Sequence, residues 1–393
     1  MVADQWTFQT KLLHNKHKFD VTTGAVSVPI QHASTFHQQG FDFSPKYDYS
    51  RSGNPTREAL EEAIAELEGG VRGFAFASGM AAISTAFLLL SKGDHVLITE
   101  DVYGGTFRVV TEVLSRFGIE HTFVDMTNLH EVASNIRPNT KVIYIETPSN
   151  PLMKVTDISG IVKLAKANNC LTFVDNTFMT PALQRPLELG ADVVLHSATK
   201  FLAGHSDVVA GLAVVKDEEL GNRLYKLQNA LGAVLGPQDC WLVLRGLKTL
   251  HVRLQQSQET AAKLAGCLLN HPAVEKVYYP GFDDHPGSSI QRYQAEGAGA
   301  VFSFQLKDGK AVEKLVSNLN IPVFAVSLGA VESILSYPAK MSHAAMPKEE
   351  REKRGITDGL LRLSVGLESF EDLKKDFLQA LSKIEIETKT TSS

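Results

Sequence analysis

From about residue 55 the chain alternates between segments of helical periodicity and short apolar runs, and this alternation limits the possible folds more than any other feature. Asn54-Pro55 is typical of a helix start, and Gly69-Gly70 of a helix end. A second helical pattern begins at Ser78 and continues to Leu90. Helices that alternate with strands are typical of βαβ units. The sequence therefore predicts an α/β fold around a mostly parallel sheet flanked by helices.

The predicted strands are short runs of apolar and β-branched residues, bounded by turn residues. They cover residues 71–77, 95–99, 141–146, 171–175 and 193–196. Further helices are predicted over residues 106–117 and 158–168.

The pattern changes past Cys240, where a long helical stretch covers residues 241–271. We therefore expect a large α/β domain over residues 55–245 and a smaller C-terminal α+β domain over residues 246–393. Residues 1–54 show little helical pattern, so an extended arm is expected there.

Composition excludes several classes of protein. With 44% hydrophobic and 21% charged residues among 393, and a net charge of −5, the chain has a globular composition and no basic excess for nucleic acid. No apolar run approaches the length of a membrane span, and the first residues do not resemble a secretion signal, so a cytoplasmic protein is expected. The three cysteines form no CxxC pattern, which argues against a disulfide framework or a zinc site.

Three candidate site residues or segments follow predicted strands, where doubly wound sheets bind ligands. Ser78-Gly79-Met80 joins a strand to a helix, where free N–H groups attract phosphate, although glycine at such a junction also has a steric explanation. Asp175 ends a strand and is placed either to hold a protonated ring nitrogen or to act as an ordinary turn acid. Lys200 is a candidate nucleophilic amine, with a surface lysine as the alternative.

Taken as a set, these residues resemble a known family. Asp175-Asn176-Thr177, His196-Ser-Ala-Thr-Lys200-Phe201 and Gly204-His205 resemble the cofactor site of the Cys/Met-metabolism family of fold type I pyridoxal-phosphate enzymes. The resemblance covers nearly the whole chain. It also includes residues 49–56, 77–81, 103–106, 146–151 and 361–366.

The resemblance implies pyridoxal 5′-phosphate as the cofactor and a small-molecule amino-acid substrate. Lys200 would carry the cofactor and shuttle protons, and Asp175 would keep the pyridine nitrogen protonated. Tyr103 would be the second catalytic residue, stacking on the ring and assisting proton transfer. The implied phosphate contacts are Ser78, Gly79, Met80, Ser197 and Thr199.

The same resemblance implies a shared active site. Tyr49 and Arg51 would reach the phosphate from a neighbouring subunit, which implies a dimer as the active unit and a homotetramer as the assembly. Arg362 would bind the substrate α-carboxylate, and Asn150 and Ser327 would orient it.

Three histidines, His196, His205 and His343, match no metal-ligand spacing. The chemistry implied by the resemblance needs no metal, so we expect these histidines to be structural and predict no metal site.

The residue before Ser327-Leu328-Gly329 bears on the reaction. Family members that act at Cγ commonly have an acid there, whereas this chain has Val326, which resembles the cystathionine β-lyases. The implied reaction is β-elimination of L-cystathionine to homocysteine, pyruvate and ammonia in methionine biosynthesis, catalysed by a carbon-sulfur lyase. Cystathionine γ-synthase or γ-lyase chemistry is the alternative. A non-catalytic binding protein on the same fold is a remote one, which the presence of Lys200 disfavours.

Overall fold

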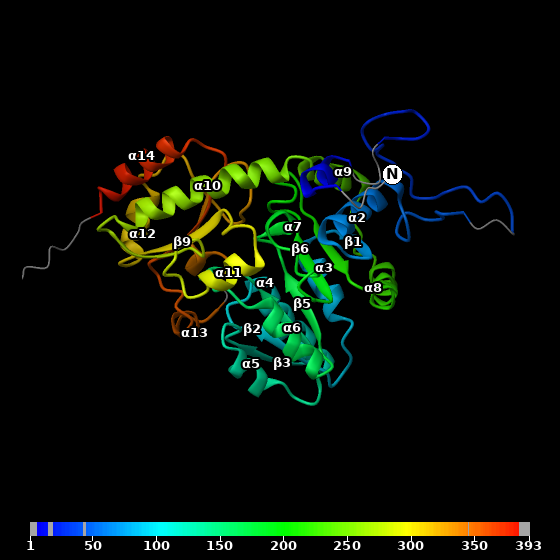
Figure 1. Cartoon of the computed structure of the whole chain (residues 1–393), viewed down its shortest axis with the longest axis horizontal. Helices are drawn as coiled ribbons and strands as arrows, with labels where there is room; N and C mark the ends of the chain where they lie inside the picture. The colour runs from blue at the N-terminus through cyan, green and yellow to red at the C-terminus, as the bar shows by residue number, and fades with distance from the viewer. Residues whose placement is uncertain (1–5, 15–18, 42–44, 345, 385–393) are drawn as a thin grey trace, which may run out of the picture.

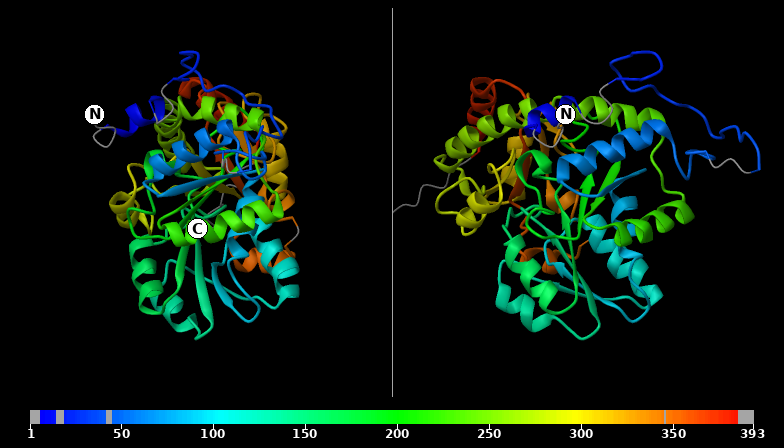
Figure 2. Two further views of the ribbon diagram at one scale, coloured as in Figure 1. Left: turned by 90° about the vertical axis from the view of Figure 1, so that its right-hand side faces the viewer. Right: turned by 45° about the vertical axis from the view of Figure 1, so that its right-hand side comes forward.

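The computed structural model describes residues 6–14, 19–41, 45–344 and 346–384. Two β-sheets, each covered by helices, lie side by side, and residues 19–41 extend away from the body they form (Figures 1 and 2). The arm also contains one short helix, α1 (Phe8–Leu13), where no helix was expected.

The first sheet has seven strands in the order β1-β7-β6-β5-β4-β2-β3. Six of them are parallel, and β7 is antiparallel to both of its neighbours. The mostly parallel sheet predicted from the sequence is therefore confirmed. The strands are β1 (Arg72–Phe76), β2 (His95–Thr99), β3 (Glu120–Val124), β4 (Thr140–Glu146), β5 (Leu171–Asp175), β6 (Val193–Ser197) and β7 (Gly211–Val215).

Two of these strands, β3 and β7, were not predicted. β3 lies at the edge of the sheet, and four of its five residues are exposed or partly exposed, so it lacks a continuous apolar run. β7 is buried throughout, but Gly211 interrupts the apolar pattern at its start. A side chain at this position would lie 2.1 Å from the Ser78 carbonyl oxygen, which explains the glycine.

Helices cover both faces of this sheet (Figure 2). Val193 and Leu195 pack on the side of α3 and α8, whereas Val194 packs on the side of α2 and α9, as the period of two along a strand requires. The helices are α2 (Pro55–Glu68), α3 (Gly79–Phe87), α4 (Gly104–Arg108), α5 (Leu129–Asn135), α6 (Ile158–Ala167), α7 (Thr180–Leu183), α8 (Glu218–Leu231) and α9 (Pro237–Leu247).

The start and end signals of α2 are confirmed. The Asn54 side chain accepts hydrogen bonds from the backbone N–H groups of Thr56 and Arg57, and Gly69 ends the helix with φ of 71°. Two other predicted helices differ from the structure. The helix beginning after Ser78 ends at Phe87 rather than Leu90, and the one predicted over residues 106–117 consists of α4, a π-helical turn (Val109–Val113) and a 3₁₀ turn (Leu114–Phe117).

The second sheet has the order β10-β11-β12-β9-β8, and all of its neighbours are antiparallel except β10 and β11. The helical stretch predicted over residues 241–271 is two helices, α9 and α10, separated at Lys248-Thr249. The domain boundaries at residues 54 and 245 stay a prediction. The elements are α10 (Leu250–Leu269), β8 (Val274–Tyr278), α11 (Ser288–Gln294), β9 (Val301–Leu306), α12 (Gly309–Val316), β10 (Val323–Phe324), β11 (Ile334–Ser336), a 3₁₀ turn (Pro338–Lys340), α13 (Lys348–Lys353), β12 (Leu360–Ser364) and α14 (Phe370–Leu381).

Among the described residues, no helix combines the length and the apolar character needed to cross a bilayer. All three cysteines are free thiols, of which Cys170 and Cys240 are buried.

Candidate active site

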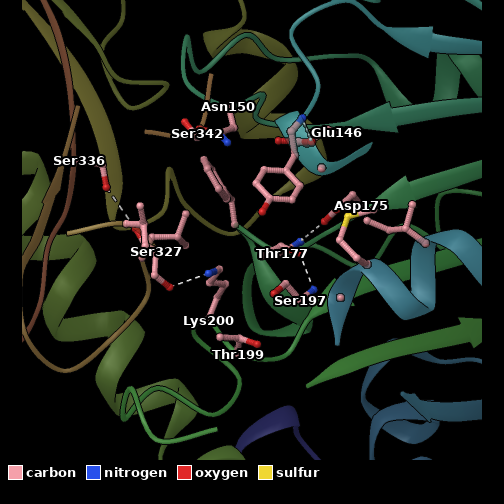
Figure 3. A pocket seen from close by; sticks show the side chains of 18 of the residues that line it. Glu146, Asn150, Asp175, Thr177, Ser197, Thr199, Lys200, Ser327, Ser336 and Ser342 are labelled. Carbon is pink, nitrogen blue, oxygen red and sulfur yellow. Dashed lines mark hydrogen bonds between the residues drawn. The ribbon is translucent and has the colours of Figure 1, made fainter. Parts of the chain in front are cut away.

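A pocket of about 470 Å³ lies at the carboxyl ends of β1, β4, β5 and β6, and the second sheet forms its opposite wall (Figure 3). The pocket therefore lies at the edge of the sheet where the sequence predicts a ligand site. Most of the predicted site residues line it. They are Ser78, Gly79, Met80, Tyr103, Asn150, Asp175, Ser197, Thr199, Lys200, Val326, Ser327 and Arg362.

Lys200 follows β6, and its side chain points into the pocket (Figure 3). Its Nζ donates a hydrogen bond of 2.6 Å to the Ser327 hydroxyl oxygen. Burial, together with the positive charge of Arg362, lowers the pKa of Lys200 to about 8. A buried amine that loses its proton this easily can act as a nucleophile or a base near neutral pH. The surface-lysine interpretation is therefore wrong.

Asp175 is the last residue of β5, and its carboxylate is buried at the floor of the pocket. It accepts hydrogen bonds from the Thr177 backbone N–H at 3.0 Å and from the Tyr144 hydroxyl at 3.3 Å. Burial raises the pKa of Asp175, while hydrogen bonds from Thr177 and the charge of His196 act in the opposite direction. A buried carboxylate of this kind suits a cationic ring nitrogen.

A second buried carboxyl group, Glu146, pairs with Asp175 across β4 and β5. Glu146 accepts a hydrogen bond of 3.0 Å from the Tyr103 backbone N–H. Burial and the neighbouring charge of Asp175 hold the pKa of Glu146 well above its usual range.

The phosphate-binding prediction falls on the start of α3. The Ser78 hydroxyl oxygen caps this helix by accepting from the Ala81 N–H at 3.0 Å. A Cβ atom on Gly79 would lie 2.9 Å from the Ser197 Cβ, so only glycine allows this close approach. The N-terminus of α3 thus lies close to the end of β6 and the hydroxyls of Ser197 and Thr199. Together they form a narrow cradle of N–H groups and hydroxyls that suits a phosphate.

Arg362 lies on β12 of the second sheet and is buried, with 4% of its surface exposed. It donates hydrogen bonds of 2.7 Å to the Asn150 side-chain oxygen and to the Ser327 carbonyl oxygen. Its Nε has no partner among the described residues, and burial lowers its pKa to about 10. A buried guanidinium that is held by neutral oxygens and retains an unused donor is placed to bind a carboxylate.

Tyr103 and Val326 border the pocket, with 39% and 65% of their surfaces exposed. A Cβ atom on Gly105 would lie 2.5 Å from the Tyr103 ring and 2.6 Å from the Met80 sulfur. Gly105 therefore allows the ring of Tyr103 to lie beside Met80 at the pocket wall.

Tyr49 and Arg51 are not among the residues that line the pocket. Arg51 donates to the Asn229 carbonyl oxygen at 2.7 Å and lies 5.6 Å from the centre of the Tyr49 ring. Both side chains are exposed within this single chain. Their role in a neighbouring active site stays a prediction.

The three histidines have separate partners. His196 contacts Glu68, His205 contacts the Ala203 carbonyl oxygen, and His343 contacts Ser342. Within the described part of the chain, no group of three or more His, Cys, Asp or Glu residues is arranged to hold a metal ion.

Sequence reasoning gave no role to several residues that line the pocket: Arg108, Glu146, Thr177, Ser336, Met341 and Ser342. Glu146 ends β4 as Asp175 ends β5, and this shared position was a usable signal. Ser336 and Ser342 come from the second sheet and the loop after it, where no local pattern marks a site.

Comparisons with known proteins show the family of this chain. The family model described as "Cys/Met metabolism PLP-dependent enzyme" matches residues 9–382, and the chain belongs to this family of pyridoxal-phosphate-dependent enzymes. It is 73% identical over 384 residues to cystathionine beta-lyase MetC of Bacillus subtilis, covering 98% of each chain. It is also 53% identical to a cystathionine gamma-lyase of the same organism, over 96% of this chain and 99% of that protein.

The structure superimposes on cystathionine gamma-lyase from Lactobacillus plantarum, complexed with L-serine, with a TM-score of 0.94 at 49% identity. The match covers 96% of this chain and 99% of that one. The expected fold type I architecture and the pyridoxal 5′-phosphate cofactor are confirmed. The amine of Lys200, the carboxylate of Asp175 and the cradle around Gly79 fit the aldehyde, ring nitrogen and phosphate of this cofactor.

Proposed function

We propose that the protein is a cystathionine β-lyase, which converts L-cystathionine to homocysteine, pyruvate and ammonia in methionine biosynthesis. The observation that carries this proposal is the position of Ser327. Its hydroxyl contacts the Lys200 amine and its carbonyl contacts Arg362, beside the apolar Val326. An amino acid bound by its carboxylate at Arg362 therefore has its Cα close to Lys200. The 73% identity to a cystathionine beta-lyase supports the same assignment.

Bound pyridoxal phosphate supplies an electron-withdrawing ring that makes the Cα proton of an attached amino acid acidic. The chain supplies the other requirements. Lys200 would take the proton from Cα, because its lowered pKa of about 8 leaves part of its amine neutral near neutral pH. Asp175 would hold the ring nitrogen of the cofactor, and Tyr103 would border its ring, because both side chains line the pocket. As Cα loses its proton, the bond from Cβ to sulfur breaks and homocysteine leaves as a thiolate.

The choice between elimination at Cβ and at Cγ depends on a second proton transfer. γ-Elimination also requires removal of a Cβ proton, which is easier when a base lies above that carbon. Of the described residues that line the pocket, Glu146 and Asp175 are the only carboxylates, and both lie buried at strand ends. Val326 supplies no base. The 53% identity to a cystathionine gamma-lyase keeps γ-elimination as the second candidate function.

The proposed active unit is a dimer, and the proposed assembly is a homotetramer. Tyr49 and Arg51 lie exposed at the base of the arm, and this exposure supports a contact with the phosphate site of a second copy. We also propose a cytoplasmic location. The free thiols of all three cysteines suit a reducing compartment.

Product analysis with L-cystathionine tests the proposed reaction. We expect pyruvate, ammonia and homocysteine as the main products. Release of mainly 2-oxobutanoate and cysteine would show that the protein is a γ-lyase. Borohydride reduction of the holoenzyme followed by peptide mapping tests the site independently, and a cofactor found on a lysine other than Lys200 would refute the assignment of Lys200.

A further inference from the structure

A buried arginine contacts the turn that carries Lys200, which is formed by residues 198–204 and is called the Lys200 turn below. Arg253 lies in the first turn of α10, and only 6% of its surface is exposed. Its Nη1 donates a hydrogen bond of 2.8 Å to the Phe201 carbonyl oxygen. Its Nη2 donates one of 2.8 Å to the Gly246 carbonyl oxygen and a longer one of 3.5 Å to that of Leu202. The guanidinium therefore binds the backbone directly after Lys200.

The place of Arg253 is unfavourable for a positive charge in two respects. Burial lowers the pKa of Arg253 to about 10, and no acid among the described residues offsets this effect. The N-terminal turn of a helix also disfavours a cation. An apolar side chain of similar length would avoid both costs. It would lack only the hydrogen bonds to the backbone, so these bonds are the feature that needs an explanation.

Two glycines make room for this contact. Gly204 has a φ of 76°, and a Cβ atom there would lie 2.2 Å from the Nη1 of Arg253. A Cβ atom on Gly246 would lie 2.3 Å from the Ala203 carbonyl oxygen, so the end of α9 approaches the Lys200 turn directly. A larger residue at either position would separate the guanidinium from the carbonyl groups that it binds.

The contact with Arg253 completes the hydrogen bonds of the Lys200 turn. The Gly204 N–H donates to the Lys200 carbonyl oxygen at 2.8 Å, and the Val331 N–H donates to the Gly204 carbonyl oxygen at 2.9 Å. The Phe201 carbonyl oxygen takes no part in these bonds, and within the described part of the chain its only donor is Arg253. Phe201 is buried, so loss of Arg253 would leave this carbonyl unpaired and favour a change in the direction of the turn.

We propose that Arg253 is a positioning residue for Lys200: it fixes the Lys200 turn and thereby the direction in which the Lys200 amine enters the pocket. Arg253 does not line the pocket, so it acts through Lys200. The inference rests on the proposed attachment of the cofactor to Lys200. In that step the Lys200 nitrogen forms a double bond to the aldehyde carbon, and the aldehyde oxygen leaves as water.

The test separates the position of the amine from the rest of the pocket. Apoenzyme is mixed with saturating pyridoxal phosphate at pH 10, well above the Lys200 pKa of about 8, and the first-order rate constant of attachment is measured by stopped-flow absorbance. The Kd of 4′-deoxypyridoxine 5′-phosphate is measured by equilibrium dialysis. This analogue has the ring and the phosphate but no aldehyde, so it binds without reacting with a lysine.

Arg253→Met keeps much of the side-chain volume and removes every N–H donor. We expect it to lower the first-order rate constant about 10–100-fold, because the reaction depends on the placement of the amine, and to change the Kd of the analogue less than about twofold. Arg253→Lys keeps the charge but loses the planar fork that reaches two carbonyl oxygens, so a smaller decrease of about three- to tenfold is expected.

Arg351→Met is the matched control. Arg351 is also buried and also donates to a backbone carbonyl oxygen, that of Ile356 at 2.8 Å, but it lies outside the Lys200 turn. Its replacement should leave the rate constant of attachment at the wild-type value.

Two results would contradict the inference. If the rate constant stays at its wild-type value in Arg253→Met, or in Arg253→Lys should the first variant not fold, Arg253 does not position Lys200. If the rate constant falls and the Kd of the analogue rises by a similar factor, Arg253 only supports the pocket as a whole. Lys200→Ala separates these failures from failure of the proposed function. Attachment at the wild-type rate in Lys200→Ala would show that another lysine carries the cofactor, and the inference would fail with that assignment.

Discussion

The pH dependence of cofactor attachment is the most direct test of the environment of Lys200. Only a neutral amine attacks the aldehyde of pyridoxal phosphate. Burial and the charge of Arg362 lower the pKa of Lys200 from 10.5 to about 8. At pH 7 the fraction of neutral amine is therefore about 300-fold larger than for an ordinary lysine, from the 2.5-unit difference between those two values.

The assay is stopped-flow absorbance after mixing apoenzyme with pyridoxal phosphate between pH 6 and pH 10. A free lysine derivative, measured in the same buffers, corrects for ionisation of the cofactor. We expect the corrected second-order rate constant to rise with pH through a midpoint near pH 8, the pKa of Lys200, and to level off about one to two pH units higher, where the amine is neutral.

Arg362→Gln provides the perturbation. Because the positive charge of Arg362 is one of the two causes of the lowered pKa, its removal should move the midpoint of the profile to higher pH. The lowering of the Lys200 pKa that remains in Arg362→Gln is the part caused by burial. A wild-type profile that still rises at pH 10, or a midpoint that does not move in Arg362→Gln, would refute this account of Lys200.

Four further outcomes are expected. The pKa of Lys200 is lower in the folded than in the unfolded state, so the stability of the apoenzyme should rise with pH between about 8 and 10.5. For the same reason Lys200→Met should increase the free energy of unfolding of the apoenzyme at pH 7 by up to about 3 kcal/mol, measured by chemical denaturation. Arg362→Ala should lower kcat/KM by a factor equivalent to about 2–5 kcal/mol while the cofactor stays bound, and an unchanged kcat/KM would remove Arg362 from the site. Mixing inactive Arg51→Ala subunits with inactive Lys200→Ala subunits should restore some activity, whereas hybrids that form and remain inactive would show that each chain builds its own site. Val326→Glu should introduce detectable 2-oxobutanoate from L-cystathionine, and pyruvate as the sole keto acid would show that Val326 does not determine the reaction.

The sequence predicted those parts of the fold whose local pattern agrees with their final environment. β2 and β5 were predicted with the bounds that the structure has, because each is a compact run of apolar residues that ends at a polar one. β3 escaped detection because an edge strand is partly exposed and needs no continuous apolar run. The irregular helix after Gly104 was also beyond prediction, since a π-helical turn has no distinct residue pattern.

The candidate site was predicted in the same uneven way. Asp175 and Lys200 stand at strand ends in recognisable motifs, so their place in the pocket followed from topology. The contact of Ser327 with both Lys200 and Arg362 could not be predicted, because it joins segments that only tertiary packing brings together.

The position of β7 between β1 and β6 determines when a newly made chain can become functional. β1 leaves the ribosome early, yet its only partner in the sheet is β7, so residues 72–76 must wait for residues 211–215 before they can pair. Strands β2 to β6 face no such delay, because each has a neighbour within that continuous stretch. Ser78 and Gly79 of the candidate site directly follow β1, and Arg362 is made near the end of translation. A nascent chain therefore lacks a complete site for cofactor and substrate during most of its synthesis, and the edge of β6 stays unpaired until β7 is made.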